Sequence, residues 1–277
     1  VPRNHSLTMS NSEPRPIFLL TDFGRSDPYV GLMKAVILQT DPSPDLVDLT
    51  HQVEPQDEIN AAFLLEYVID DLPPESVVLL VVDPKVGTDR DIIAVETDQG
   101  RTVLAPDRGL VNGLDWNRAR YVTNDDLARS DVSSTFHGRD WFAPVGRFLS
   151  QGGAFEELGA SVERSPGPSI VPDPEVRDGQ LIGRVVHVDH FGNAITNLKP
   201  DDLDGFLPEW RNRARVHLKE HRITKFVETY DDGTGAVGLI GSFERLELAV
   251  PGGSAARKLD VAPGAELTIT QKERVSR

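Results

Sequence analysis

The chain has 277 residues, a formal net charge of −15 at pH 7 and no cysteine. The absence of cysteine excludes disulfide bonds, thiolate catalysis and cysteine metal sites, and it fits a reducing cytoplasm, where we expect the protein to reside. The 44 acidic residues outnumber 29 basic ones, no Lys/Arg cluster is present, and no apolar run approaches the roughly 18 residues of a membrane span. Nucleic-acid and membrane partners are therefore not expected.

The amino-terminal part alternates short apolar runs with helical patterns. Residues 1–15 have no apolar core of a secretory signal, so we expect a disordered tail. A strand (PIFLL, 16–20) then precedes a helix within 27–41, with Asp27 and Pro28 suited to the N-cap and first turn. The elements expected next are a strand at 46–53, a helix at 58–72, an apolar strand of interior, parallel type at 77–82, and strands at 91–98 and 102–107.

The composition and the hydrophobic pattern of the sequence change after this alternating region. Residues 164–179 are rich in Pro, Ser and Gly and are typical of a linker. Residues 180–277 contain short alternating runs divided by turns, which is the pattern of a small all-β barrel or sandwich. We therefore expect an N-terminal layered α/β domain over 16–163 and a small C-terminal all-β, barrel-like domain over 180–277.

Three expected strands end in an aspartate: Asp22, Asp83 and Asp189. In open α/β sheets the ligand crevice lies outside the carboxyl ends of the strands, so carboxylates placed there are site candidates. Each aspartate could instead simply begin a turn by accepting hydrogen bonds from nearby backbone amides. Three such positions, each followed by Gly or Pro within three residues, favour a site.

Two further side chains are candidates for chemistry near Asp83. Arg90 follows it by seven residues, and a tight loop could place its guanidinium and the carboxylate over one cavity. Arg90 would then stabilise an anion such as hydroxide, although a surface ion pair is the alternative. His137 lies between Phe136 and Gly138 in an expected loop, where a histidine is more often functional than on an apolar helix face.

Common nucleotide and hydrolase motifs are absent. The sequence has no GxGxxG after a strand and no GxxxxGK[ST] loop, which argues against a grip on a pyrophosphate or triphosphate. It also has no GxSxG elbow and no HExxH or paired-His metal spacing. The candidate residues must therefore be judged by other patterns.

Seven segments at these same residues resemble one family. The segments are TDFGRSDPYVGLMKAVI, LTHQVEPQDEINAAFLL, VVDPKVGTDRD, APDRGL, STFHGRDWFAPVGRFL, DHFGNAITNL and GSFERLELAV, in this order along the chain. Together they resemble the S-adenosylmethionine (SAM) hydroxide adenosyltransferases, the adenosine-forming SAM hydrolases related to the fluorinases and chlorinases. The resemblance implies an α/β domain followed by a β-barrel-like domain. It also implies a homotrimer with sites between the N-terminal domain of one subunit and the C-terminal domain of its neighbour.

The resemblance also implies roles for individual residues. Asp83, Arg90 and His137 would handle the attacking water, and the reaction would convert SAM to adenosine and L-methionine with no metal or cofactor. The implied substrate-binding residues are Asp22 for the ribose hydroxyls, Phe136 for stacking, Asn193, Glu247 and the Val250 backbone for adenine, Asp27, Asp189 and Ser242 for the methionine end, and Phe191. Two positions depart from the family pattern: Lys85 stands where glycine is usual, and Gln56 stands where an aromatic residue is common.

Three other functions stay open from the sequence. A SAM-dependent halogenase would use chloride or another halide as the nucleophile. A metal-dependent phosphoesterase would use the strand-end aspartates and His137 as ligands. A protein of a different class would bind SAM or adenosine without turnover.

Overall fold

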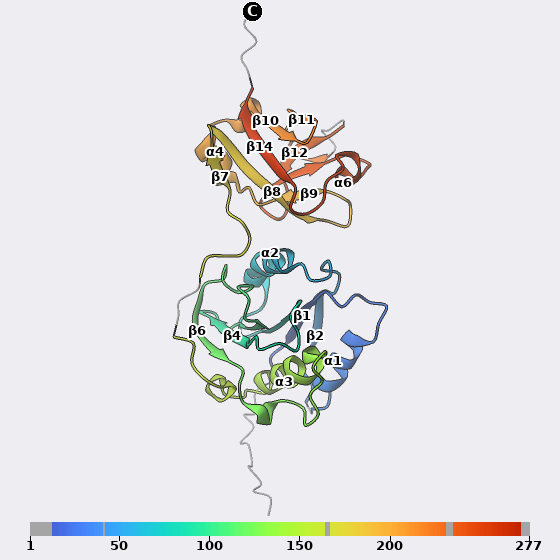
Figure 1. The fold of residues 1–277 in the computed structure, drawn as a ribbon, viewed down its shortest axis with the longest axis vertical. Coiled ribbons are helices and arrows are strands. Elements are labelled where there is room, and N and C mark those ends of the chain that lie inside the picture. Colours follow the sequence, from blue (N-terminus) through green and yellow to red (C-terminus); the bar gives the residue numbers. More distant parts are fainter. Residues whose placement is uncertain (1–12, 41, 164–166, 231–234, 273–277) are drawn as a thin grey trace, which may run out of the picture. The chain divides into compact units, whose positions relative to one another are not determined.

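The computed structural model describes residues 13–40, 42–163, 167–230 and 235–272, and the chain divides into two compact units between Ile170 and Val171 (Figure 1). This division falls inside the segment expected to be a linker. Residues 1–12 of the expected tail lie outside the described residues. Arg15, which we also placed in the tail, donates hydrogen bonds to the Gly100 carbonyl at 2.7 Å and to the Thr102 hydroxyl at 3.0 Å.

The first unit contains one mixed sheet in the order β2-β1-β3-β5-β4-β6. Its strands are β1 (Ile17–Thr21), β2 (Leu46–Thr50), β3 (Val77–Val81), β4 (Ile92–Thr97), β5 (Thr102–Pro106) and β6 (Trp116–Tyr121). Strand β3 pairs in parallel with both β1 and β5, which confirms the interior parallel strand expected from its unbroken apolar run. Strand β4 is antiparallel to β5 and β6.

Helices cover both faces of this sheet (Figure 1). The helices are α1 (Tyr29–Ile37), α2 (Glu58–Val68) and α3 (Ala143–Ser150), with 3₁₀ turns η1 (Ile69–Asp71), η2 (Asp125–Leu127) and η4 (Phe155–Leu158) and a π-helical turn η3 (Gly138–Phe142). Successive side chains of a strand point to opposite faces. Ile17 and Leu19 therefore pack with α1 and α3, whereas Phe18 and Leu20 pack with α2. The layered α/β prediction is confirmed.

The start of α1 differs from the expectation. The helix begins at Tyr29, Pro28 occupies the N-cap position, and no side chain caps the helix, so Asp27 is not the N-cap. Helix α2, in contrast, is capped by Asp57, whose carboxylate accepts a hydrogen bond from the Asn60 amide at 2.9 Å. The Asp27 carboxylate stays exposed before the helix.

The second unit is an antiparallel sheet in the order β11-β10-β14-β8-β9-β13-β12, with β7 added beside β8, and it forms a nearly closed barrel. Its strands are β7 (Glu175–Arg177), β8 (Gln180–Val188), β9 (Ala194–Thr196), β10 (Ala214–Leu218), β11 (His221–Ile223), β12 (Val237–Ile240), β13 (Leu246–Ala249) and β14 (Glu266–Gln271). The sequence did not predict three short helices, α4 (Pro200–Phe206), α5 (Trp210–Arg213) and α6 (Ala255–Lys258). Trp210 anchors the core of this unit at 1% exposure.

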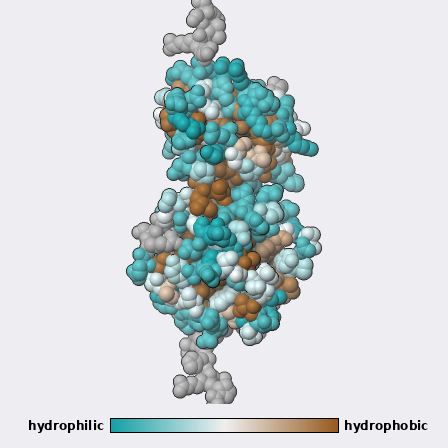
Figure 2. Space-filling model, viewed as in Figure 1, coloured by the Kyte–Doolittle hydropathy of each residue, from teal (hydrophilic) through white to brown (hydrophobic). Residues whose placement is uncertain are grey.

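Hydrophilic residues predominate on the face drawn in Figure 2, with apolar residues scattered among them. Within the described residues, no helix is both long enough and apolar enough to cross a membrane.

Candidate active site

Two of the three strand-end aspartates meet at one edge of the N-terminal sheet. Strands β1 and β3 are parallel neighbours with Thr21 opposite Val81, so Asp22 and Asp83 follow them at the same carboxyl edge. Both residues line one cavity of about 280 Å³. Asp189 follows β8 in the second unit and belongs to a different cavity.

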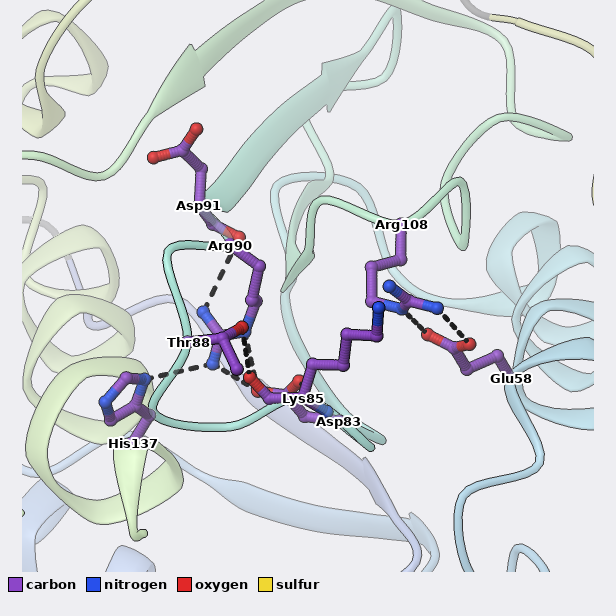
Figure 3. A network of polar contacts seen from close by, with 8 residues as sticks. All are labelled: Glu58, Asp83, Lys85, Thr88, Arg90, Asp91, Arg108 and His137. Atoms are coloured by element: carbon purple, nitrogen blue, oxygen red, sulfur yellow. Dashed lines mark hydrogen bonds and ion pairs between the residues drawn. The ribbon is translucent and has the colours of Figure 1, made fainter. Parts of the chain in front are cut away.

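Arg90 lies between Asp83 and His137 (Figure 3). Its Nε donates to Asp83 Oδ2 at 2.7 Å, its Nη2 donates to the same oxygen, and Nη2 lies 3.0 Å from His137 Nδ1. The side chains of Arg90 and Asp83 are only 7% and 6% exposed, so little water screens the pair. The structure thus places the three residues of the expected water-handling set in direct contact.

This contact fixes the proton arrangement on His137. A guanidinium can only donate hydrogen bonds, so His137 Nδ1 must accept and the ring proton must sit on Nε2. Burial lowers the pKa of His137, and the nearby Arg90 charge lowers it further, against smaller opposing effects of Asp83 and Asp140. At neutral pH His137 is therefore a neutral imidazole with an Nε2–H donor.

The loop that carries His137 is held by a buried carboxylate. Asp140, in the π-helical turn η3, is fully buried, and its Oδ2 accepts the Ser133 amide at 2.8 Å while its Oδ1 accepts Arg139 Nε at 2.6 Å. Gly138 packs tightly against helix α1, since a Cβ there would lie 3.2 Å from Met33 Sδ. These contacts fix the backbone on both sides of His137.

The Asp22 carboxylate lies beside this group. Burial raises the pKa of Asp22, the neighbouring Asp83 charge adds to the rise, and a hydrogen bond from the Gln56 amide opposes it. The Gln56 amide donates to Asp22 Oδ2 at 2.9 Å, and Gln56 has a positive φ of 68°. The donor is the backbone amide rather than the Gln56 side chain, a contact that the sequence could not reveal.

Aromatic rings form another wall of the same cavity. Phe136 lies edge-on to Phe23 and Tyr29, with ring centroids 5.9 and 5.2 Å apart. Of these three rings, only Phe136 is predicted from the sequence, because Phe23 and Tyr29 look like ordinary members of a turn and a helix. The described residues that line the cavity are Asp22, Phe23, Tyr29, Pro55, Gln56, Val81, Asp83, Val86, Thr135, Phe136, His137 and Gly138. Asp27 and Lys85 are not among them.

The other expected binding residues gather in the second unit around a cavity of about 630 Å³. Its described lining is Asp189, Phe191, Asn193, Tyr230, Ser242, Phe243, Glu247, Val250, Pro251, Gly252, Gly253 and Arg257. Asp189 accepts hydrogen bonds from the Asn193 amide at 2.8 Å and from its side-chain nitrogen at 2.9 Å. The Phe191 side chain stands out from this unit at 77% exposure.

Glu247 is buried in this cavity wall at 2% exposure. The Tyr230 hydroxyl donates to its Oε1 at 2.7 Å, and its Oε2 lies so close to Gly241 that a Cβ there would be 2.1 Å away. Burial raises the pKa of Glu247, and the Asp189 charge raises it further against the effect of Tyr230. Tyr230 has no sequence motif around it, so sequence reasoning missed it.

Comparison with known proteins identifies the family of the chain. The SAM hydroxide adenosyltransferase N-terminal domain matches residues 17–159, and the C-terminal domain of the same family matches residues 183–268.

The chain belongs to this family.

Its similarity to individual family members extends over nearly the whole chain. An (R)-S-adenosyl-L-methionine hydrolase of Thermus thermophilus is 36% identical over 268 residues, which cover 92% of this chain and 99% of the relative. A fluorinase of Nocardia brasiliensis is more distant, 26% identical over 76% of this chain and 80% of its own. A crystal structure of an uncharacterized conserved protein from Thermotoga maritima has a TM-score of 0.83 and 34% identity, and covers 91% of this chain and 99% of its own.

The described side chains form no cluster of the kind that binds a metal ion. Within the described ranges, no group of three or more His, Asp or Glu side chains is arranged to hold one. The strand-end aspartates and His137, which the phosphoesterase hypothesis needs as ligands, form no such group there.

Proposed function

We propose that this chain hydrolyses SAM at the ribose C5′ carbon and releases adenosine and L-methionine. Its homology to (R)-S-adenosyl-L-methionine hydrolases, over nearly the full length of both chains, supports this reaction. Within the site, the observation that carries the proposal is the buried Arg90 that joins Asp83 to His137. This arrangement suits a small oxygen nucleophile rather than a covalent enzyme intermediate.

The proposed hydrolysis requires an activated nucleophile but no general acid. The sulfonium of SAM leaves as a neutral thioether, so no group has to protonate it. Water attacks C5′ opposite the sulfur, its oxygen forms the new C–O bond, and the C–S electron pair goes to sulfur. Alignment of the two reactants can contribute about 7–11 kcal/mol.

The three polar residues then have distinct tasks. The His137 Nε2–H remains as a donor to an oxygen in the cavity that His137 lines, because its Nδ1 already accepts from Arg90. Asp83 Oδ2 accepts both hydrogen bonds from the Arg90 guanidinium, whereas Oδ1 accepts, among the described residues, the Lys85 amide at 3.2 Å. Asp83 Oδ1 is therefore the candidate acceptor for the proton of water. Arg90 stabilises the negative charge on the carboxylate and on the developing hydroxide.

The remaining residues suit the rest of the substrate. Asp22 offers two acceptor oxygens to the ribose diol, and Phe136 offers a ring face or edge to the nucleoside. In the second unit, hydrogen bonding to Asp189 orients the Asn193 amide, whose Oδ1 can accept the adenine amino group. Glu247, Phe191 and the Val250 backbone would complete the adenine pocket, while Asp27, Asp189 and Ser242 would bind the methionine end.

These groups lie in two separate units, which supports a composite site. We infer a homotrimer in which the N-terminal unit of one subunit and the C-terminal unit of its neighbour bind one SAM. Light scattering should give three times the chain mass. Mixed trimers of Asp83→Asn and Asn193→Ala subunits should regain activity that neither variant has alone, and failure to regain it would contradict sites shared between subunits.

Isotope labelling tests the reaction itself. SAM incubated with the protein in oxygen-18 water should give adenosine labelled at the 5′ hydroxyl and unlabelled methionine. The Asp83→Asn protein is the control for spontaneous breakdown. The same incubation with added chloride separates the halogenase alternative, since 5′-chloro-5′-deoxyadenosine in place of labelled adenosine would refute hydrolysis. SAM recovered unchanged from the wild-type protein would indicate a binding protein.

A further inference from the structure

A buried histidine outside the water-handling group contacts the turn that carries Asp22. His51 follows β2 and is 2% exposed, and its Nδ1 lies 2.9 Å from the hydroxyl of Thr21, the last residue of β1. Its other ring nitrogen, Nε2, lies 3.0 Å from Asp48 Oδ1. Asp48 in turn pairs with Lys34 of helix α1 at 2.7 Å.

The contacts that link Asp48, His51 and Thr21 have one consistent donor-to-acceptor direction. Lys34 holds Asp48 as a carboxylate, and Asp48 Oδ1 lies 3.0 Å from His51 Nε2 without making a hydrogen bond to it. The nearby negative charge favours the proton on Nε2 and leaves Nδ1 as an acceptor. The Thr21 hydroxyl must then donate to Nδ1, which leaves its oxygen to accept the Phe23 amide at 3.2 Å. Phe23 lies directly after Asp22, so the hydrogen bonds end on the turn that aims this carboxylate.

The same turn is tied to the segment after β2 at two more points. The Gly24 amide donates to the His51 carbonyl at 2.7 Å, and the Gln56 amide donates to Asp22 Oδ2 at 2.9 Å. Gly24 has a positive φ of 67°, the left-handed conformation that lets the chain leave β1 abruptly. Side chain and backbone of His51 thus both hold residues 21–24.

We propose that His51 is a positioning residue for substrate binding, which fixes the Asp22 carboxylate toward the ribose hydroxyls through the Thr21 hydroxyl. This proposal rests on the proposed function, in which Asp22 binds the ribose. It assigns a task to a buried histidine that takes no part in activating water. Its loss weakens recognition of the diol and leaves the contacts to the base unchanged.

A hydroxyl-deleting substitution tests the proposal. Thr21→Val keeps the branched shape but leaves His51 Nδ1 and the Phe23 amide without their partner. The affinity for adenosine, measured by calorimetry on the full chain, should fall by roughly tenfold to a hundredfold, by analogy with the loss of a group that orients a metal ligand. The affinity for 2′,3′-dideoxyadenosine, which has no diol, should stay at the wild-type value. Thr21→Ser should restore the preference for adenosine.

Thr97→Val is the matched control in the same sheet. Thr97 is buried at the end of β4, and its hydroxyl has no hydrogen-bond partner among the described residues, so both affinities should be unchanged. If Thr21→Val does not fold, Asp48→Asn should produce the same selective loss, because it removes the charge that orients His51. Equal weakening of both nucleosides, or no weakening, overturns the positioning role.

Asp22→Asn separates this role from the proposed function. A defective Asp22→Asn protein beside a wild-type-like Thr21→Val protein overturns the task of His51 alone. An Asp22→Asn protein that keeps the full preference for adenosine over the dideoxynucleoside overturns the assignment of Asp22 to the ribose, and the proposal with it. Hydrolysis of SAM would stand in either case.

Discussion

Substituting Arg90 by lysine keeps a positive charge but removes the planar fork that reaches two partners. The guanidinium donates from Nε and Nη2 to Asp83 and from Nη2 to His137 Nδ1. A lysine ammonium is a single point and cannot keep the geometry of both contacts. A hydrogen bond to a charged group is worth about 1.5–3 kcal/mol. At about 1.36 kcal/mol for each factor of ten, kcat of Arg90→Lys should fall by about 13-fold to 160-fold.

The assay is adenosine release at saturating SAM, with adenosine affinity measured separately. The affinity should change little, since Arg90 is expected to contact the nucleophile rather than the nucleoside. Arg108→Lys is the matched control: Arg108 pairs with Glu58 in the same part of the molecule but does not contact His137 (Figure 3), and kcat should be unchanged. A kcat for Arg90→Lys within threefold of wild type would refute the bridging role.

Four further predictions concern the binding cavity and pH. Tyr230→Phe should weaken adenosine binding by about tenfold, because the buried Glu247 carboxylate loses its hydrogen-bond donor. An unchanged affinity in calorimetry would contradict this prediction. Gly241→Ala places a Cβ 2.1 Å from Glu247 Oε2 and should cost about 1–3 kcal/mol of unfolding free energy in urea titrations, whereas Gly205→Ala, which meets nothing within 4 Å, should cost none. Since burial and Arg90 lower the pKa of His137, kcat should hold at pH 6.5 and fall only at lower pH; a loss centred above 6.5 would contradict this. Between that lowered pKa and about 6.5 the unfolded chain binds more protons, so stability should rise with pH there, and His137→Gln should flatten the rise.

Local sequence determined most of the regular structure of the N-terminal unit. Strand β3 could be predicted because an interior parallel strand is covered on both faces and needs an unbroken apolar run. Strand β6 could not, because it lies at the sheet edge and its exposed Asn117 and Arg118 resemble a loop. The expected Asp27 cap was wrong, since Pro28 occupies that position and the aspartate side chain caps nothing.

For the candidate site residues, too, local sequence indicated the residues themselves, whereas the fold decided their proximity. Residue type and strand ends pointed to Asp22, Asp83, Arg90 and His137, because a carboxylate after an apolar strand is a local signal. Their convergence depends on strand order. Strands β1 and β3 are neighbours, although the paired Ile17 and Val77 lie 60 positions apart in the sequence, with a helix–strand–helix segment between them.

Only the tertiary structure decided which ordinary residues support the site. His51, Gln56 and Tyr230 acquire their roles from contacts made across 30, 34 and 17 positions of sequence, and one of these contacts is made by a backbone amide, which carries no side-chain signature. A sequence pattern records periodicity and residue type over one element at a time. The direction of a hydrogen bond and the burial of a charge depend on elements that fold together from distant parts of the chain.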